Sequence, residues 1–265
     1  MLYILATPIG NLGDITLRAL ETLRSCDYIL CEDTRRCKIL LDHYRIQKPL
    51  ISFHTFNEKK REEKVLQDLQ EGKKIALTSD AGTPTISDPG EKLVQKALDL
   101  GLQVTALPGP CSYIQALVLS GLNKERFQCC GFLPVKKRQQ ALKKALFFQG
   151  ISIFLLPARD LIEVLKEMPT TKIAVMRELT KIHEERKVGS GKELLSYYQA
   201  HPPKGEIVLL IEGGKKEELP LYLLIPLLQE EYGLSQKEAI KLGAKLLRTA
   251  KSSIYRDVNK NVKIQ

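Results

Sequence analysis

The sequence predicts an α/β protein with two domains and a small C-terminal helical segment, and three observations support this fold class. Short apolar runs alternate with segments of helical periodicity over the first 120 residues, which indicates a largely parallel sheet covered by helices. A second set of alternating elements follows a polar turn near residues 121–126. At 265 residues the chain is long enough for two modest domains with their own cores.

The first domain is expected to span residues 1–121 and to contain five strands. The apolar runs that predict them lie at 2–6, 28–31, 50–53, 75–78 and 104–107. Between the first two runs, residues 16–24 place Leu17, Leu20 and Leu23 at helical spacing. The alternation predicts helices on both faces of the sheet.

Two further helices are expected in this domain. Residues 57–70 have the pattern of a charged surface helix, with Asn57 as the N-cap and Gly72 as a stop signal. A second helix is expected to open at Asp88, with Pro89 in the first turn and Glu91 three residues after the cap. This cap is a sufficient structural reason for Asp88, so we do not count it among the catalytic candidates.

The second domain is expected to span residues 122–214. Strands are predicted at 128–132, 151–156, 172–176 and 206–211, and helices at 136–148, 160–167 and 191–200. The remaining residues, 215–265, are expected to form a basic helical segment, in which Ser235 and Glu238 form a capping box. One face of its helix holds the basic residues Lys237, Lys241, Lys245 and Arg248. The rest of the helix holds the apolar residues Ala239, Ile240, Leu242, Leu246 and Leu247. We expect the apolar residues to face the body of the protein and the basic face to point outward.

The net charge of +10 is concentrated in two places. Residues 135–148 hold five basic residues and no acidic one, and residues 233–265 hold eight basic residues and two acidic ones. Such patches favour a polyanionic partner, while solvated helix faces are the alternative.

Composition also excludes several classes of protein. No apolar run approaches the length that crosses a bilayer, and the N-terminus lacks the basic region of a signal peptide, so we expect a cytoplasmic protein. The six cysteines form no CxxC pair and no cluster with zinc-ligand spacing. We therefore expect free thiols and no metal.

Five short loops rich in Gly, Pro and Asp follow the apolar runs. They are Thr7–Asn11, Glu32–Arg35, Ser79–Pro84, Pro108–Pro110 and Lys204–Glu206. Ligands of open α/β sheets bind beyond the carboxyl ends of the strands, so these loops predict one elongated ligand held largely by main chain. The chain lacks both the G-x-G-x-x-G and the G-x-x-x-x-G-K-[ST] patterns, which disfavours an NAD or ATP enzyme.

Seven motifs occur in a characteristic order: TPIGNLGDIT, EDTR, SDAGTPTISDPG, PGP, GFLP, RELTKIHEE and KGEIVLLIEG. Over residues 1–213 the chain resembles the bacterial 16S rRNA (cytidine 2′-O) methyltransferase family, within the tetrapyrrole-methylase superfamily, and the tail resembles that family's C-terminal helical segment. The resemblance implies a two-domain tetrapyrrole-methylase-like fold, S-adenosylmethionine in the interdomain cleft, and a homodimer. It also implies methylation of a cytidine ribose in the decoding region of 16S rRNA, in the 30S subunit.

The resemblance assigns the donor-binding role mainly to the first and third loops. The residues concerned are Pro8, Gly10, Ser79, Asp80, Ala81, Gly82, Thr83 and Pro84, joined by Arg177 from the second domain. Methyl transfer needs alignment of the acceptor oxygen and removal of its proton. Candidates for this proton chemistry are Asp80, Glu178, Lys181, Lys204 and Glu206.

Contacts with rRNA phosphates are expected from basic residues outside the donor loops. These are Arg35, Arg36, Lys136, Lys137, Arg138, Lys237, Lys241, Lys245 and Arg248. His54 and His183 are more typical of structural histidines than of catalytic ones.

Structural alternatives stay open for several candidates. Glu178 and Lys181 lie three residues apart and would pair if the stretch were helical. Asp80 would serve only its own loop if it formed an Asx-turn. Where the family has a glycine after GTP this chain has Thr85, and where the family has an acid and a histidine it has Leu155 and Ala158.

Two other functions compete with rRNA methylation. A small-molecule methyltransferase acting on a tetrapyrrole is disfavoured by the basic patches, because such a substrate needs no polycationic tail. A non-enzymatic RNA-binding or assembly factor is disfavoured by retention of all five loops.

Overall fold

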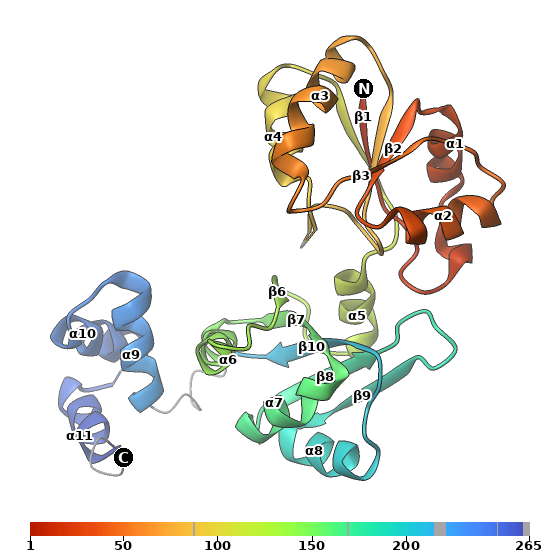
Figure 1. Cartoon of the computed structure of the whole chain (residues 1–265). Helices are drawn as coiled ribbons and strands as arrows, with labels where there is room; N and C mark the ends of the chain where they lie inside the picture. The colour runs from red at the N-terminus through yellow and green to blue at the C-terminus, as the bar shows by residue number, and fades with distance from the viewer. Residues whose placement is uncertain (87, 169, 215–220, 248, 262–265) are drawn as a thin grey trace. The chain divides into compact units, whose positions relative to one another are not determined.

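The computed structural model describes residues 1–86, 88–168, 170–214, 221–247 and 249–261. The chain divides into two compact units, one formed by residues 1–119 with 176–185 and the other by residues 120–175 with 186–265. Figure 1 shows a separate sheet in each part of the chain. The finer division into 1–121, 122–214 and 215–265 stays a prediction.

The first sheet has five strands, and all of its paired strands run parallel. They are β1 (Leu2–Leu5), β2 (Tyr28–Cys31), β3 (Leu50–Ser52), β4 (Ile75–Thr78) and β5 (Val104–Leu107), in the order β3-β2-β4-β1-β5. Leu2 of the central β1 lies opposite Ile75 on one side and Val104 on the other. The predicted parallel sheet and its five strand positions are confirmed.

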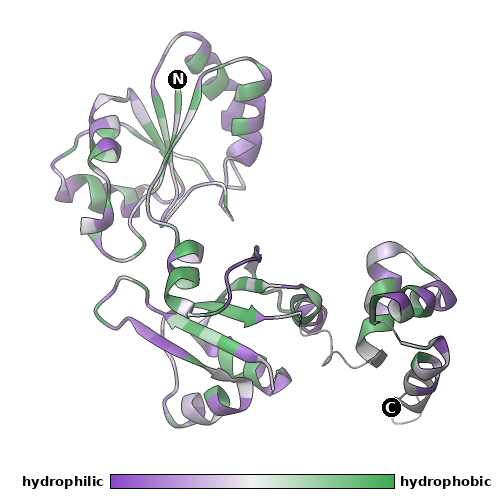
Figure 2. Cartoon of the chain, turned by 180° about the vertical axis from the view of Figure 1, so that it is seen from behind, coloured by the Kyte–Doolittle hydropathy of each residue, from purple (hydrophilic) through white to green (hydrophobic). Residues whose placement is uncertain are grey.

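Helices cover both faces of this sheet (Figure 1). They are α1 (Leu17–Ser25), α2 (Thr34–His43), α3 (Glu58–Gln70) and α4 (Glu91–Asp99). A short 3-10 helix, η1, lies at Leu12–Asp14, and α5 (Ser112–Ser120) follows β5. Leu23 of α1 packs in one core with Ile29 of β2, whereas Leu93 of α4 packs in another core with Leu30, the next residue along β2. Successive strand side chains point to opposite faces, so each strand contributes to both cores. Most of α5 is hydrophobic (Figure 2).

Two helix starts in this unit differ from the sequence expectation. The segment Glu32–Arg35 is not a loop throughout, because α2 begins at Thr34 and Asp33 is its N-cap, accepting a hydrogen bond from the Arg35 N–H at 2.9 Å. Asp88 is not a cap either. The helix α4 begins at Glu91, after Gly90, whose φ of +116° turns the chain in a way that side-chain-bearing residues rarely adopt.

Asn57 occupies the N-cap position of α3 without capping it by its side chain. Its side-chain oxygen accepts a hydrogen bond from the backbone N–H of His54 at 2.9 Å, so it closes the preceding turn. The expected stop of this helix is confirmed, since Gly72 follows its end with a φ of +88°.

The second sheet is mixed. Its strands are β6 (Phe127–Phe132), β7 (Ile151–Pro157), β8 (Lys172–Arg177), β9 (Glu185–Ser190) and β10 (Glu206–Glu212), in the order β6-β7-β10-β8-β9. The central β7 is parallel to β6 and antiparallel to β10. The strand β9 was not predicted, because its sequence ERKVGS has no apolar run.

Three helices pack on one core of this unit, together with a 3-10 turn, η2, at Ala158–Asp160. They are α6 (Arg138–Phe147), α7 (Leu161–Glu167) and α8 (Gly191–Ala200), close to the predicted ranges. Ser190 and Glu193 form a capping box at the start of α8.

The described C-terminal residues form α9 (Leu221–Tyr232), α10 (Gln236–Leu247) and α11 (Lys251–Asn261). The predicted capping box is confirmed, since the Ser235 hydroxyl and backbone N–H both donate to the Glu238 carboxylate. The buried face of α10, with Ala239 and Ile240, packs in one cluster with residues of α9 and α11, and Phe147 of α6 packs against this cluster. Leu246 was expected on the apolar face, but it is exposed. No helix among the described residues has the length and apolar character needed to span a membrane.

A buried carboxylate ties β2 to α3 in the first unit. Asp68 is only 4% exposed, accepts from the Tyr28 hydroxyl at 2.9 Å, and pairs with the ammonium groups of Lys73 at 2.7 Å and Lys64 at 3.1 Å. Burial by itself would raise the pKa of Asp68, but these three partners together hold it below its usual value.

We expect Asp68→Asn to lower the free energy of unfolding by about 1–3 kcal/mol at pH 7, because it removes hydrogen bonds to a charged group. A folded-state pKa below the unfolded value stabilises the fold above pH ~4 and loses this effect as the pH falls. Urea unfolding from pH 3 to 8 should therefore show the two proteins converging in acid. Glu71→Gln, which removes an exposed carboxylate 3.7 Å from Lys73, is the control and should change little.

Candidate functional site

Three of the five predicted loops meet at the carboxyl edge of the first sheet, because β1 lies between β4 and β5. The Thr7 N–H donates to the Gly82 carbonyl oxygen at 2.9 Å, and the Gly82 N–H donates back at 3.0 Å. The Thr83 hydroxyl donates to the Pro110 carbonyl oxygen at 3.0 Å. The loops after these strands therefore bring together the donor-site candidates Pro8, Gly10, Ser79, Asp80, Ala81, Gly82, Thr83 and Pro84.

The segment after β8 packs against the first of these loops. A Cβ atom on Gly10 would lie 2.5 Å from Cγ of Lys181, 2.8 Å from Oγ1 of Thr180 and 3.0 Å from the carbonyl oxygen of Leu179. Only glycine fits at such distances, so the backbone of the β1 loop lies directly on this segment. Although residues 179–181 follow a strand of the second sheet, they belong to the first unit.

This segment has an unusual backbone and one unsatisfied hydroxyl. Glu178 and Thr180 have φ values of +51° and +67°, a conformation that is costly for residues with a side chain and rare for a β-branched one. The Thr180 hydroxyl is buried and has no hydrogen-bond partner among the residues that the structure describes. Strain and buried orphan groups of this kind gather at functional sites.

The ion pair considered for Glu178 and Lys181 is present, with Nζ of Lys181 3.0 Å from Oε1 of Glu178. The stretch is not helical, however, since it forms a turn between β8 and β9. Arg177, the second-domain candidate for donor binding, donates to Glu185 Oε2 at 2.7 Å. Its side chain is 20% exposed.

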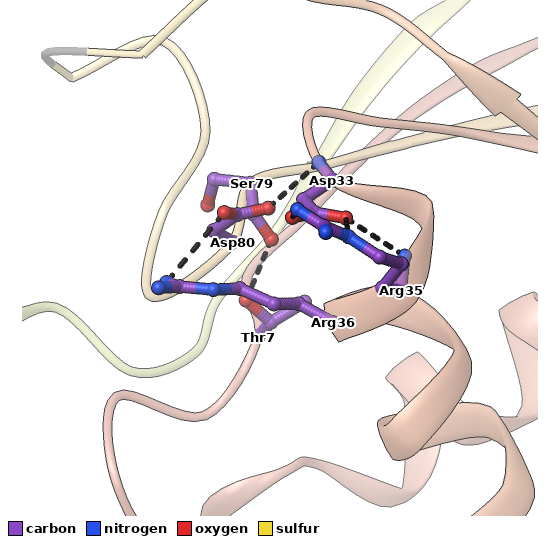
Figure 3. A network of polar contacts seen from close by, with 6 residues as sticks. All are labelled: Thr7, Asp33, Arg35, Arg36, Ser79 and Asp80. Carbon is purple, nitrogen blue, oxygen red and sulfur yellow. Dashed lines mark hydrogen bonds and ion pairs between the residues drawn. The ribbon is translucent and has the colours of Figure 1, made fainter.

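Asp80 connects the β4 loop to the start of α2 (Figure 3). Its Oδ1 accepts from the Asp33 N–H at 2.9 Å, and its Oδ2 lies 3.6 Å from the Arg36 guanidinium. The Asx-turn alternative is therefore not what holds this carboxylate. Behind it, the Thr7 hydroxyl donates to the Ser79 carbonyl oxygen at 3.1 Å, which links the β4 loop to the β1 loop.

Arg35 reaches back over its own helix start. Its guanidinium makes two hydrogen bonds to Asp33, at 3.0 Å from Nε and 2.7 Å from Nη2 (Figure 3). These bonds, with the Arg35 N–H, lower the pKa of Asp33 to about 2. The Arg35 side chain is still 88% exposed, so it stays accessible to a partner.

Three carboxylates behind this surface influence one another. Burial, followed by the charges of Glu32 and Asp80, raises the pKa of Asp88 to about 6. The pKa of Glu32 is raised as well, by burial first and then by the charge of Asp80. Like charges in a partly desolvated place favour the neutral form, so Asp88 and Glu32 bind protons at higher pH than ordinary carboxylates do.

Thr85 departs from the family glycine and still adopts the conformation of a glycine. Its φ is +70°, in the left-handed region where an L-residue pays about 1–2 kcal/mol. This backbone conformation is one that glycine adopts readily, and it places local strain on Thr85.

Lys204 and Glu206 belong to the second unit, at the N-terminal end of β10. Their loop follows α8 and leads into the strand, so the prediction that it follows an apolar strand, as the other loops do, is wrong. Both are exposed, and Gly205 between them has a φ of +92° and accepts a hydrogen bond from the Ala158 N–H at 3.1 Å. Their roles in proton chemistry stay predictions.

The RNA-contact candidates of the second unit differ in accessibility. Lys136 and Lys137 are exposed, whereas Arg138 pairs with Glu167 at 2.8 Å. All three line a hollow of about 540 Å³ that also involves Lys143 and α9. On α10, the predicted basic residues Lys237, Lys241 and Lys245 are exposed, and Arg248 lies outside the described residues.

His54 and His183 have different environments, and their structural role stays a prediction. The His54 ring contacts Asn57 at 3.1 Å and the Phe56 N–H at 3.3 Å, and His183 is exposed. Among the described residues no group of three or more His, Cys, Asp or Glu side chains could hold a metal ion.

Sequence reasoning missed Glu32, Phe56 and Thr180 as possible site residues. Glu32 lies in the EDTR motif directly after a strand, which was a usable signal, and Thr180 lies within RELTKIHEE. For Phe56 the sequence holds only a weak signal, an aromatic residue shortly after a strand.

Comparisons with known proteins show which family the chain belongs to. Residues 1–195 match the family Tetrapyrrole (Corrin/Porphyrin) Methylases. The chain is 43% identical over 220 residues to a protein from Thermotoga maritima called Ribosomal RNA small subunit methyltransferase I, covering 80% of this chain and 98% of that one. A protein of the same name from Escherichia coli O157:H7 is 42% identical over 270 residues, covering 96% and 93%.

Solved structures show the fold more widely. The chain is similar to the crystal structure of diphthine synthase, with a TM-score of 0.62 and 14% identity, covering 80% of this chain and 89% of that one. It is also similar to uroporphyrin-III-C-methyltransferase from Thermus thermophilus, with a TM-score of 0.55 and 17% identity, covering 79% and 93%.

We expect Asp88→Asn to stabilise the protein above pH 7. A folded-state pKa near 6, above the ordinary value of an aspartate, means that ionisation of Asp88 destabilises the fold as the pH rises through 6. The neutral variant avoids this loss, so its free energy of unfolding should exceed that of the wild type at pH 8 and match it below pH ~4. Urea unfolding across this range measures the difference, and a constant difference at all pH values would contradict the assignment.

Proposed function

The chain belongs to the tetrapyrrole methylase family and, within it, to the small-subunit rRNA methyltransferases; from this premise we propose that it transfers a methyl group from S-adenosylmethionine to the ribose 2′-hydroxyl of a cytidine in 16S rRNA. The observation that carries the proposal is 42% identity, over 96% of this chain, to a relative named Ribosomal RNA small subunit methyltransferase I. The donor, the ribose 2′-hydroxyl and the cytidine are what the family resemblance implies. The basic α10 surface and the Lys136–Lys137 run add support, because they suit a polyanionic acceptor.

The first unit suits S-adenosylmethionine by its backbone. Gly10 in the β1 loop and Gly82 in the β4 loop have no side chain at points where a Cβ atom would meet close neighbours. Main-chain groups of these loops can therefore approach a ligand. The buried, unpartnered hydroxyl of Thr180 beside Gly10 supplies a polar group that a bound molecule could satisfy. When bound, S-adenosylmethionine supplies a methyl group already activated on a sulfonium sulfur.

The residues of this chain then have two tasks, to orient the 2′-oxygen and to take its proton. We assign the proton-accepting task to the Glu178–Lys181 pair, which lies on the segment packed against Gly10. Asp80 is less suited, because its two oxygens already bind the Asp33 N–H and face Arg36. Lys204 and Glu206 stay as second-unit candidates.

The expected rRNA contacts follow from the proposed acceptor, and the expected oligomeric state and location follow from the family resemblance. Arg35 and Arg36, both exposed, are proposed to contact rRNA phosphates next to the donor loops. We infer a homodimer that works in the cytoplasm on the 30S subunit.

The proposal is tested with S-adenosylmethionine carrying a labelled methyl group. The protein is incubated with 30S subunits, naked 16S rRNA or a tetrapyrrole, and digested nucleosides are analysed by mass spectrometry. Label in 2′-O-methylcytidine supports the proposal, whereas label only in the tetrapyrrole, or donor binding without transfer, overturns it.

A matched pair of glycine variants locates the donor site in the same assay. Gly10→Ala should weaken S-adenosylmethionine binding at least tenfold, because the new methyl group would overlap Lys181. Gly13→Ala meets only Asn11 Oδ1 at 3.3 Å and should bind within about twofold of the wild type. Titration calorimetry measures both.

We expect reversal of Lys237, Lys241 and Lys245 to glutamate to weaken binding to 16S rRNA by at least about tenfold and to flatten its salt dependence, because fewer counterions are released. S-adenosylmethionine affinity should not change. The control reverses Lys172 and Lys192, two exposed lysines elsewhere in the second unit. Equal rRNA affinity of the two variants would show that the α10 lysines form only a solvated helix face.

A further inference from the structure

A hollow of about 460 Å³ lies beyond the carboxyl ends of β2, β3 and β4, entirely within the first unit. Its size is within the range of roughly 300–1,000 Å³ typical of sites for small ligands. Three strand ends supply its walls, with residues 32–35 from the start of α2, residues 52 and 54–56 from the turn after β3, and Asp80 from the β4 loop. The carboxyl edge of a parallel sheet is where such folds bind ligands.

The hollow adjoins the proposed donor loops. Asp80 lines it and is held by the Asp33 N–H at 2.9 Å, while the adjoining Ser79 accepts from the Thr7 hydroxyl of the β1 loop at 3.1 Å (Figure 3). The β4 loop is therefore both a wall of the hollow and one of the proposed donor loops. A group bound in the hollow lies next to a methyl donor bound by these loops.

Phe56 stands at the hollow with almost no contact of its own. Its side chain is 98% exposed, and its ring meets the His54 ring edge-on with centroids 6.0 Å apart. The turn that carries it is fixed, since Asn57 bonds to the His54 N–H at 2.9 Å and to the Ser52 carbonyl oxygen at 3.1 Å. An uncovered aromatic ring on a turn held in this way can serve as the platform on which an unstacked base lies.

Glu32 lines the same hollow as a half-buried carboxylate. Within the described part of the chain its side chain makes no hydrogen bond and no ion pair at 4 Å or less, although His54, Arg36, Asp33 and Asp80 influence it over longer distances. A desolvated carboxylate without a partner accepts a hydrogen bond strongly. The acidic interior also repels phosphate, so a base rather than the backbone of RNA is the part that enters.

Resting on the proposed function, we propose that this hollow receives the cytosine of the acceptor nucleotide, with Phe56 stacked on the ring and Glu32 accepting a hydrogen bond from the N4 amino group. A carboxylate is the natural partner of cytosine N4, whereas uracil presents its O4 oxygen there and is repelled. Glu32 is then a specificity-determining residue that distinguishes cytidine from uridine. Arg35, which is paired with Asp33 and 88% exposed at the rim, is accessible to the flanking phosphate.

The test compares 30S subunits reconstituted with cytidine or with uridine at the methylated position. For Glu32→Gln we expect kcat/KM on the cytidine substrate to fall by about 10- to 100-fold, and the preference for cytidine over uridine to shrink by at least about tenfold, because an amide can also donate to O4. Glu21→Gln, at an exposed glutamate of α1, is the matched control and should change neither value.

Phe56 is tested by binding. For Phe56→Ala we expect the affinity for the cytidine-containing rRNA to fall by about 5- to 100-fold with the preference for cytidine kept, and Phe56→Tyr should restore binding. The matched control is Leu17→Ala, at a residue of α1 that is 80% exposed. All variants should bind S-adenosylmethionine like the wild type, which shows that they are folded.

The outcomes separate this inference from the proposed function. If the wild-type protein methylates no 16S rRNA, the proposed function fails and the hollow has no cytosine to receive. If the wild type methylates cytidine while Glu32→Gln keeps its full preference over uridine, or Phe56→Ala binds rRNA normally, the function stands and this inference is overturned.

Discussion

All five strands of the first sheet run in the same direction, and this constraint determines where the chemistry of the unit can occur. Parallel strands end at one edge, so the segments after β1, β2, β3, β4 and β5 all converge there although they are far apart in the sequence. The central position of β1 makes its loop a neighbour of the β4 and β5 loops. The two backbone hydrogen bonds between Thr7 and Gly82 fix that contact. The donor loops and the hollow beside them are consequences of this single arrangement.

Close packing at this edge is kept at the expense of backbone strain. Gly10 touches the segment 179–181 so closely that no side chain fits, and that segment holds Glu178 and Thr180 in left-handed conformations. Thr85 keeps such a conformation where the family has glycine. Each residue of this kind costs of order 1–3 kcal/mol and persists only where the surroundings force it. The sheet and its two cores provide those surroundings.

Electrostatics divides the same edge into an acidic interior and a basic rim. After burial, the charge of Asp80 raises the pKa of Glu32, and the charges of Glu32 and Asp80 raise the pKa of Asp88, while Arg35 and Arg36 are exposed to solvent. In the proposed complex, the arginines at the rim would contact RNA phosphates and the carboxylate of Glu32 would accept a hydrogen bond from a base amino group. The proposal thus assigns binding of the RNA backbone and recognition of the base to different residues of one small region.

The sequence by itself determined the fold class, the strand positions and most helix positions, because these depend on local apolar periodicity and on caps such as Ser235–Glu238. It also determined the family, through seven motifs in order. It did not reveal the helices α2 and α5, or β9, whose residues carry no apolar run. The start of α4 was also misplaced, because a left-handed Gly90 replaces the expected cap at Asp88. Only the tertiary structure decided that residues 179–181 lie on Gly10, that Asp80 joins the β4 loop to α2, and that Glu32 and Phe56 share a hollow. These are contacts between residues 24 to more than 160 positions apart along the chain. Such contacts arise from the order in which strands pair, and no local pattern encodes that order.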